Sequence, residues 1–461
     1  MHYSAANGDS RLSCWLRVRE FAVPPSMIES ATARRATGDW AGACAAAHVD
    51  VDLNLRCAAH AYGQEFAACL RADLRHLAPD LLRWHMPRIA PDGLMRPGLT
   101  VSLARYDPMG RGDGGTVHLV ARTPPAWADA GQRISLALWD GSRLGAGLHP
   151  HPRPHRRFRL DLHRHLWDVR RVGELRVRSG ADRPPDDGRP TPNLDMPLAR
   201  DCAVDRWAPE AWMLLRTIGR AGGAVAVRLG GRRRLVLDLA VDGDTSGLPA
   251  LRIRTAPTRG DASALPVLPD AATWVLPDLA LLRAGLIEAD RLHPLVASAL
   301  VLGRSPVGGP RSPEGGGGPR LVECRGAQHR IGLVNEVLVP LDHGPAEIRR
   351  ERLLAALTGT PLPCLQVIDE AHRAPDCLID VRARLDHGDT AGALAAVEGL
   401  LGPGAPLPRG ALRDELETAA QRRIEYGLFR AELAELGQGP AARPGRRSRG
   451  DRARPRHTTF R

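Results

Sequence analysis

The sequence predicts an α+β protein of several domains, in which helical N- and C-terminal regions flank a β-rich middle. Three observations predict this class. The chain has 461 residues, which is enough for about three domains of ~150 residues each. Apolar residues recur at three- and four-residue spacing near both ends, as in amphipathic helices. Between them, short runs rich in valine, leucine and isoleucine alternate with polar residues and end at turn formers, as strands do.

The domain boundaries follow from changes in composition along the chain. Residues 303–319 place glycine or proline at eleven of seventeen positions, and residues 181–200 contain five prolines. Such segments are typical of linkers. We therefore expect a helical domain at 26–97, a small antiparallel β domain at 98–180, a linker at 181–200, an α+β domain at 201–302, a Gly/Pro-rich linker at 303–319, a short β segment plus helical domain at 320–437, and a disordered arginine-rich tail at 438–461.

The helical N-terminal region begins after two prolines. Ser26 and Glu29 have the spacing of a capping box, so a helix is expected to begin there and to end near Gly38. A second helix is expected to begin at Asp39. Apolar spacing predicts further helices over 63–77, 80–86 and 278–301, a helix bracketed by Pro345 and Gly359, and others over 365–373, 376–387, 389–401 and 411–435.

The strands of the middle region are predicted from period-two alternation. Phe158 and Leu160 alternate with arginine, aspartate and histidine, which predicts a half-buried strand over 157–165. Strands are also expected at 100–106, 116–122, 133–139, 224–229, 233–241, 251–255, 320–326 and 329–341.

Composition excludes several classes of enzyme. All 64 basic residues are arginine, because the sequence contains no lysine. A phosphate-binding Walker loop, a pyridoxal Schiff base and a standard protein-kinase site each require lysine. With its abundant alanine, glycine and proline, the chain resembles multi-domain proteins of high-GC actinobacteria in composition. The eight cysteines form no C-x-x-C pair and the N-terminus has no apolar leader, so we expect a cytoplasmic protein without a membrane span.

The stretch from His149 to Arg178 carries five histidines and nine arginines in thirty residues. Two H-x-H pairs on a strand would place imidazoles on one face about 7 Å apart, within reach of one ion. The predicted ligands, with zinc as the candidate ion, are His149, His151, His163, His165 and Asp161. Two alternatives stay open. The segment could bind phosphate or carboxylate bidentately through an anion surface of six arginines, Arg156, Arg157, Arg159, Arg164, Arg170 and Arg171. It could also be a solvated strand face, which we prefer.

Two segments at opposite ends of the chain are similar to each other. Residues 34–47 and 384–397 are identical at eight of fourteen positions, including Gly-Asp followed by Ala-Gly-Ala. Each resembles the turn of a tetratricopeptide-like helical hairpin, in which glycine closes one helix and aspartate caps the next. The resemblance implies a helical docking surface. A capped, alanine-rich hairpin of any origin would show the same residues, and we favour that interpretation.

The C-terminal tail is strongly basic. Residues 443–461 hold eight arginines and one aspartate, which accounts for +7 of the formal net charge of +12. Too few apolar residues remain for a folded core. The arginines expected to bind a polyanion are Arg443, Arg446, Arg447, Arg449, Arg452, Arg454 and Arg456.

From the sequence we expect a non-enzymatic adaptor that binds another protein and carries a basic tail for an acidic partner. Nucleic acid or another polyanion is the other candidate for the tail. The alternative is a metal-dependent hydrolase that uses the His149–His165 cluster, with three protein ligands and a water on the ion. No catalytic residue is assigned.

Overall fold

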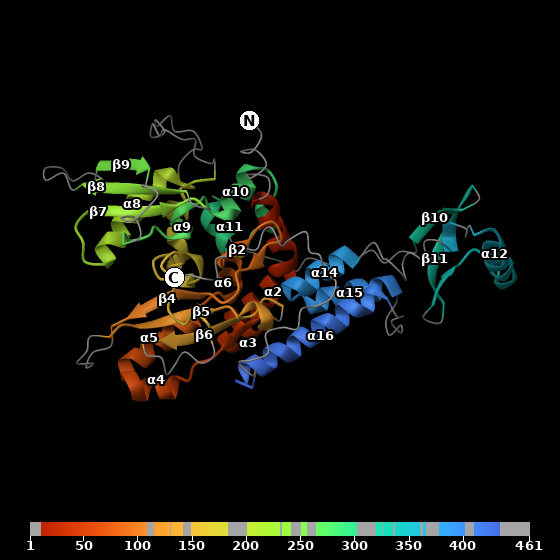
Figure 1. Ribbon diagram of the computed structural model, residues 1–461, viewed down its shortest axis with the longest axis horizontal. Helices are drawn as coiled ribbons and strands as arrows, with labels where there is room; N and C mark the ends of the chain where they lie inside the picture. The colour runs from red at the N-terminus through yellow and green to blue at the C-terminus, as the bar shows by residue number, and fades with distance from the viewer. Residues whose placement is uncertain are drawn as a thin grey trace. The chain divides into compact units, whose positions relative to one another are not determined.

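The protein is a mixed α+β chain of two units (Figure 1). One unit holds the described residues up to 301 apart from a short loop at 128–131, and the second holds that loop and the described residues from 320 to 433. The computed structural model describes residues 11–107, 115–129, 131–141, 149–182, 201–230, 233–240, 250–255, 264–301, 320–324, 326–334, 337–359, 363–365, 378–401 and 410–433.

The first unit alternates short helices with two principal sheets. Its helices and π or 3₁₀ turns include η1 (Val18–Ala22), α2 (Pro25–Ala36), α3 (Trp40–Ala46), α4 (Leu55–Tyr62), α5 (Gln64–Arg75), α6 (Pro79–His85), η3 (Arg164–Leu166), η4 (Val169–Glu174), α7 (Leu175–Ser179), α8 (Val204–Thr217), α9 (Asp270–Thr273), α10 (Pro277–Arg283), η6 (Ala289–Arg291) and α11 (Pro294–Leu300). Its strands are β1 (Val49–Val51), β2 (Arg88–Ile89), β3 (Leu94–Met95), β4 (Thr100–Tyr106), β5 (Val117–Arg122), β6 (Ile134–Trp139), β7 (Gly223–Arg228), β8 (Arg234–Ala240) and β9 (Ala250–Thr255).

The larger core of this unit lies against a four-stranded sheet. The strand order is β1-β6-β5-β4, with β1 parallel to β6 and the other pairs antiparallel. Helix α5 buries Phe66, Leu70 and Leu74, which share one face because they are four residues apart. The indoles of Trp84 and Trp167 are also fully buried. Burying each large apolar side chain stabilises the fold by about 1.5–3 kcal/mol.

A second core forms where α8 covers the antiparallel sheet β7-β8-β9. Trp207, Ala211 and Leu215 of α8 pack against side chains such as Val225 and Leu237 of the strands. The buried indole of Trp207 donates a hydrogen bond to the carbonyl of Thr273 at 3.1 Å. The polar atom of this large side chain is therefore satisfied inside an apolar core.

The second unit combines a small sheet with helices. The antiparallel strands are β10 (Arg320–Cys324), β11 (Ala327–Val334) and β12 (Val337–Pro340). The helix predicted between Pro345 and Gly359 is confirmed as α12 (Pro345–Thr358), with proline in its first turn and Gly359 in the left-handed conformation at its end. Helices α14 (Leu378–His387), α15 (Thr390–Leu401) and α16 (Ala411–Arg430) share a small core.

Several predicted features are placed differently or lie outside the described residues. The helix expected over 278–301 is two helices, α10 and α11, because Gly285 ends the first in the left-handed conformation. The core around α5 also crosses the boundary predicted at residue 97, since it includes Val101 and Leu119. Most of the linker at 181–200, all of the linker at 303–319 and the tail lie outside the described residues. None of the described helices has both the length and the hydropathy needed to cross a bilayer.

The two similar segments form helical hairpins with the same capping contacts. In α2–α3, Asp39 accepts a hydrogen bond from the Gly42 amide at 2.8 Å and pairs with Arg34 at 3.0 Å. The α14–α15 hairpin repeats this arrangement: Asp389 accepts from the Gly392 amide at 2.9 Å and pairs with Arg384 at 2.9 Å. The aspartate thus caps the second helix, and the arginine of the first helix holds the aspartate.

The contacts explain why glycine follows three residues after each aspartate. A Cβ atom at Gly392 would lie 2.1 Å from Oδ2 of Asp389 and 2.8 Å from a guanidinium nitrogen of Arg384. A Cβ atom at Gly42 would meet its own aspartate at 2.0 Å. Any side chain there would displace the capping carboxylate, so the glycine is required by the cap.

We expect the substitutions Asp389→Ala and Gly392→Ala to be strongly coupled. Asp389→Ala removes the cap and should destabilise α15 by about 1 kcal/mol. Gly392→Ala in the wild-type background should destabilise α15 by a similar amount, because it displaces the same capping carboxylate. In the Asp389→Ala background, Gly392→Ala should instead stabilise α15 by about 0.5–1 kcal/mol, because alanine is the better helix former. Native-state hydrogen exchange of the α15 amides measures the stability of this helix in wild type, the two single variants and the double variant. Additive effects would contradict the coupling.

Candidate functional site

The stretch 149–178 is a looped segment of turns and short helices. The strand predicted over 157–165 is wrong: Arg159 makes a single bridge to Ser102 of β4, and the segment then turns. Phe158 and Leu160 are buried as the alternation predicted. The segment also makes backbone hydrogen bonds within itself: the His163 amide donates to the Leu160 carbonyl at 3.1 Å. Among the described residues it keeps only two backbone hydrogen bonds to β4, from the amides of His155 and Asp161, and local turns close much of the rest.

His149 is buried with both ring nitrogens engaged. Its Nε2 lies 3.0 Å from the Thr123 carbonyl oxygen, and its Nδ1 accepts a hydrogen bond from the His151 amide at 3.2 Å. Burial lowers the pKa of His149 to about 4, so the ring is neutral at pH 7. His151 is exposed beside it. The first H-x-H pair thus fixes a turn and offers no pair of converging nitrogens.

The second H-x-H pair is buried under α8. The rings of His163 and His165 are 5.8 Å apart between centroids, and Nδ1 of His163 lies 3.0 Å from the Arg159 carbonyl oxygen. Nε2 of His163 lies 3.1 Å from Oε2 of Glu210. Asp161 binds the guanidinium of Arg159 through both oxygens. None of the five predicted ligands belongs to a group of three or more described side chains whose ligand atoms are close enough to hold an ion.

Glu210 of α8 is the anion around which this part of the segment is organised. Arg178 donates to both of its carboxylate oxygens at 2.6 Å, and the carboxylate is 4% exposed. Burial by itself would raise the pKa of Glu210, but the neighbouring His163 and Arg178 outweigh it and hold the pKa below its ordinary value. The carboxylate is therefore ionised and joins α8 to the end of the looped segment.

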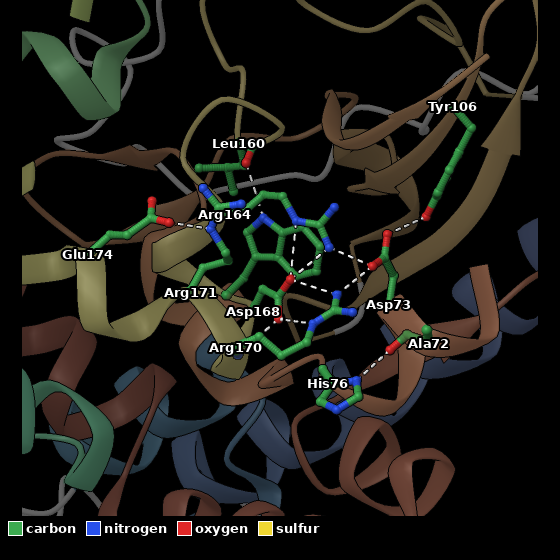
Figure 2. A network of polar contacts seen from close by, with 11 residues as sticks. Ala72, Asp73, His76, Tyr106, Leu160, Arg164, Asp168, Arg170, Arg171 and Glu174 are labelled. Carbon is green, nitrogen blue, oxygen red and sulfur yellow. Dashed lines mark hydrogen bonds and ion pairs between the residues drawn. The ribbon is translucent and has the colours of Figure 1, made fainter. Parts of the chain in front are cut away.

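A second carboxylate centre is formed by Asp73 and Asp168 (Figure 2). Asp168 accepts hydrogen bonds from Arg164 at 2.7 Å and from Arg170 at 2.8 Å. Both guanidinium groups also reach Asp73 of α5, which accepts a further hydrogen bond from Tyr106 of β4. Figure 2 shows the two arginines between the two carboxylates.

The charges in this network balance. Burial alone would raise the pKa of Asp168, yet hydrogen bonds from Arg170 and Arg164 hold it below the ordinary value. Burial and the carboxylate of Asp73 raise the pKa of Tyr106, so its hydroxyl stays protonated and donates. Two anions meet two cations, and each has several hydrogen bonds, as a partly buried ion pair requires. The network joins α5 and β4 to the looped segment.

Most arginines of the predicted anion surface are used internally. The surface comprised six arginines, and five of them contact carboxylates of the same unit: Arg157 with Asp270, Arg159 with Asp161, Arg164 and Arg170 with Asp73 and Asp168, and Arg171 with Glu174. An arginine already held by a carboxylate loses that partner when it binds an external anion. The segment therefore acts first as an internal cross-link.

A hollow of about 590 Å³ opens beside these ion pairs. That volume lies within the range of small-molecule sites. Most of its lining comes from the looped segment: Asp161, Leu162, Arg164, Arg171, Gly173, Glu174, Val177 and Arg178, with Met213 and Thr217 of α8. Both signs of charge line the hollow beside Leu162, Val177 and Met213, so charged and apolar groups both face it.

Sequence reasoning found the segment but missed its partners. Asp73 lies 91 residues before Arg164, and Glu210 lies 32 residues after Arg178. Neither carboxylate belongs to a motif, so only the folded chain brings it to the segment. The chain matches no protein-family model, no curated protein and no solved structure.

Proposed function

We propose that this protein is a non-enzymatic adaptor that binds an acidic partner through its arginine-rich tail. The observation that carries the proposal is the charge of residues 443–461, which hold eight arginines and one aspartate. One aspartate can neutralise only one of these arginines within the tail. The remaining arginines attract an external polyanion, because each polyanion charge that an arginine neutralises releases condensed counterions.

The arginines of the folded part support this assignment by contrast. In the looped segment, Arg164, Arg170 and Arg178 each contact a carboxylate at hydrogen-bonding distance. These three guanidinium groups therefore serve the fold. The tail has the same residue type with a single acid in its own sequence, and its net charge of +7 favours an acidic partner.

Exposed leucines support a protein as the partner. Leu353, Leu354 and Leu357 of α12 are 64%, 52% and 85% exposed. Leu357 is four residues after Leu353 and three after Leu354, and residues at these spacings lie on one side of a helix, so the three form an apolar strip. Such a strip would be buried by an apolar patch of a partner protein. An acidic protein with such a patch fits both features.

A truncation that ends at Gly437 tests the tail. With duplex DNA as a generic polyanion, full-length protein should bind without sequence preference and with strong salt dependence. Each phosphate neutralised contributes about 0.9 to the slope of log affinity against log salt, so eight arginines allow a slope of up to about −7. The truncated chain should bind more weakly and with a much flatter slope. Fluorescence anisotropy between about 0.05 and 0.2 M salt measures both.

The matched control keeps the length of the tail and removes its charge. A variant with all eight tail arginines changed to glutamine should behave like the truncation, and a variant with the tail residues shuffled should bind like wild type. If full-length and truncated protein bind DNA equally weakly, the tail is a spacer and nucleic acid is dropped as a partner.

A further inference from the structure

We propose that the second unit binds a divalent transition-metal ion, with zinc as the reference ion, through His343, Glu347 and Glu351. Glu347 and Glu351 are four residues apart on one face of α12, and His343 lies in the turn that precedes the helix. Their ligand atoms all lie within 4.8 Å of one another. This site is distinct from the cluster predicted in the first unit and independent of the tail.

The imidazole of His343 is placed as a ligand. Its side chain is 2% exposed, and neither ring nitrogen has a hydrogen-bond partner among the residues that the structure describes. A buried polar nitrogen without a partner is costly, so a bound ion would satisfy one of the two. Its Nδ1 faces both carboxylates, 3.7 Å from Oε2 of Glu347 and 3.8 Å from Oε1 of Glu351.

These separations suit an ion between the three groups. A direct charge-assisted hydrogen bond would bring nitrogen and oxygen to about 2.7–2.9 Å. Ligands about 2.0–2.1 Å from a tetrahedral zinc ion are instead roughly 3.4 Å apart. The side chain of Glu347 is 42% exposed, so it can move the few tenths of an ångström that closure requires. The buried Glu351 supplies the fixed carboxylate.

The sheet holds His343 in position from the other side. The ring of His329 on β11 stacks on the ring of His343 with centroids 4.4 Å apart and planes 25° apart. The neighbouring Asp342 accepts hydrogen bonds from the backbone amide and the guanidinium of Arg330. Strand β11 therefore fixes the turn that carries the imidazole. We assign His329 as a positioning residue, because stacked rings do not converge on one ion.

One imidazole nitrogen and two carboxylate oxygens define the class of ion. Imidazole favours zinc, copper, iron and nickel over magnesium and calcium, and carboxylates accept divalent ions generally. Three protein ligands leave a fourth tetrahedral position for water. The site would therefore bind zinc with one coordination position open to solvent.

Metal binding by the full-length chain tests the proposal. After dialysis against zinc, elemental analysis should find one more tightly bound ion per chain in wild type than in His343→Phe, which keeps an aromatic ring against His329. Glu347→Gln, at the half-exposed position where misfolding is least expected, should weaken zinc binding in a chelator competition. The loss should exceed the ~10- to 100-fold that removal of an outer-sphere partner costs.

Two matched variants sharpen the result. Glu417→Gln changes an exposed acid on α16 that pairs with Arg413, and it should retain wild-type affinity. His329→Phe preserves the stacking and should also retain the ion, with an unchanged visible spectrum of the cobalt-substituted protein. Equal zinc affinity in wild type, His343→Phe and Glu347→Gln would overturn the site. Loss of the ion in His329→Phe would overturn the assignment of three ligands.

Discussion

Replacing Asp278 by asparagine is expected to destabilise the first unit by about 3–5 kcal/mol, the cost of leaving a buried charge without its partner. Asp278 of α10 is fully buried and pairs with Arg19 of η1 at 2.9 Å, across 259 residues of sequence. The indole of Trp84 donates to the other carboxylate oxygen at 2.8 Å. Burial is the largest influence on the pKa of Arg19 and lowers it, so the carboxylate of Asp278 is needed to compensate the buried guanidinium charge.

Urea unfolding followed by tryptophan fluorescence measures this loss in the first unit, because all nine tryptophans lie between residues 15 and 274. Asp238→Asn breaks an exposed ion pair with Arg254 and should cost only a small fraction as much. The double variant Arg19→Met with Asp278→Leu should recover much of the stability, since an apolar pair leaves no buried charge. If Asp278→Asn lowers the free energy of unfolding no more than Asp238→Asn does, the buried ion pair does not stabilise the unit more than an exposed one.

Elements whose signals are local were predictable from the sequence. Strands β4, β5 and β6 lie within one residue of the predicted ranges, because alternation of side chains is visible within six or seven residues. Helix α12 was predicted from its two ends, since proline and glycine punctuate the chain at fixed positions. The capped turns at Asp39 and Asp389 were predictable as well, because glycine and aspartate mark them within a few residues.

The looped segment was not predictable because its structure depends on distant partners. Phe158 and Leu160 alternate with polar residues in the turn as they would in a strand. The difference lies in Asp73 and Glu210, which hold the segment from α5 and α8. No spacing in the sequence predicts ion pairs across 91 or 32 residues. The partners of the predicted metal ligands were not predictable for the same reason: His163 lies against Glu210 and His149 against the Thr123 carbonyl.

The site in the second unit shows the opposite case. The four-residue spacing of His343, Glu347 and Glu351 is readable in the sequence, and the helix beginning at Pro345 was expected. Acids at that spacing are usually a solvated helix face. Burial of His343 beside His329 becomes visible only when β11 packs against the turn. The sequence spacing therefore identifies candidate ligands, and the folded structure shows which of them lie close together.

The stability of the first unit is expected to fall steeply between pH 6.5 and pH 4. Burial is the largest cause of a lowered pKa at several histidines. At four of them the pKa is lowered strongly, to about 4 at His85, His149 and His155 and well below the ordinary value at His165. In the unfolded chain each titrates near 6.5. Between these values the unfolded state binds more protons, so stability is fully present above about 6.5 and is lost as pH falls.

Each such histidine contributes up to about 1.4 kcal/mol per pH unit, so four give a slope of roughly 5 kcal/mol per unit at the steepest point. Urea unfolding at half-unit intervals from pH 7.5 to pH 4.5, read by tryptophan fluorescence, measures it. His165→Leu should reduce the slope by about one proton's share. Val172→Ala, at a buried apolar position of the same segment, should lower stability equally at every pH. A slope that His165→Leu leaves unchanged would show that the buried imidazole accepts its proton in the folded state, because only a difference in proton binding between the two states produces the slope.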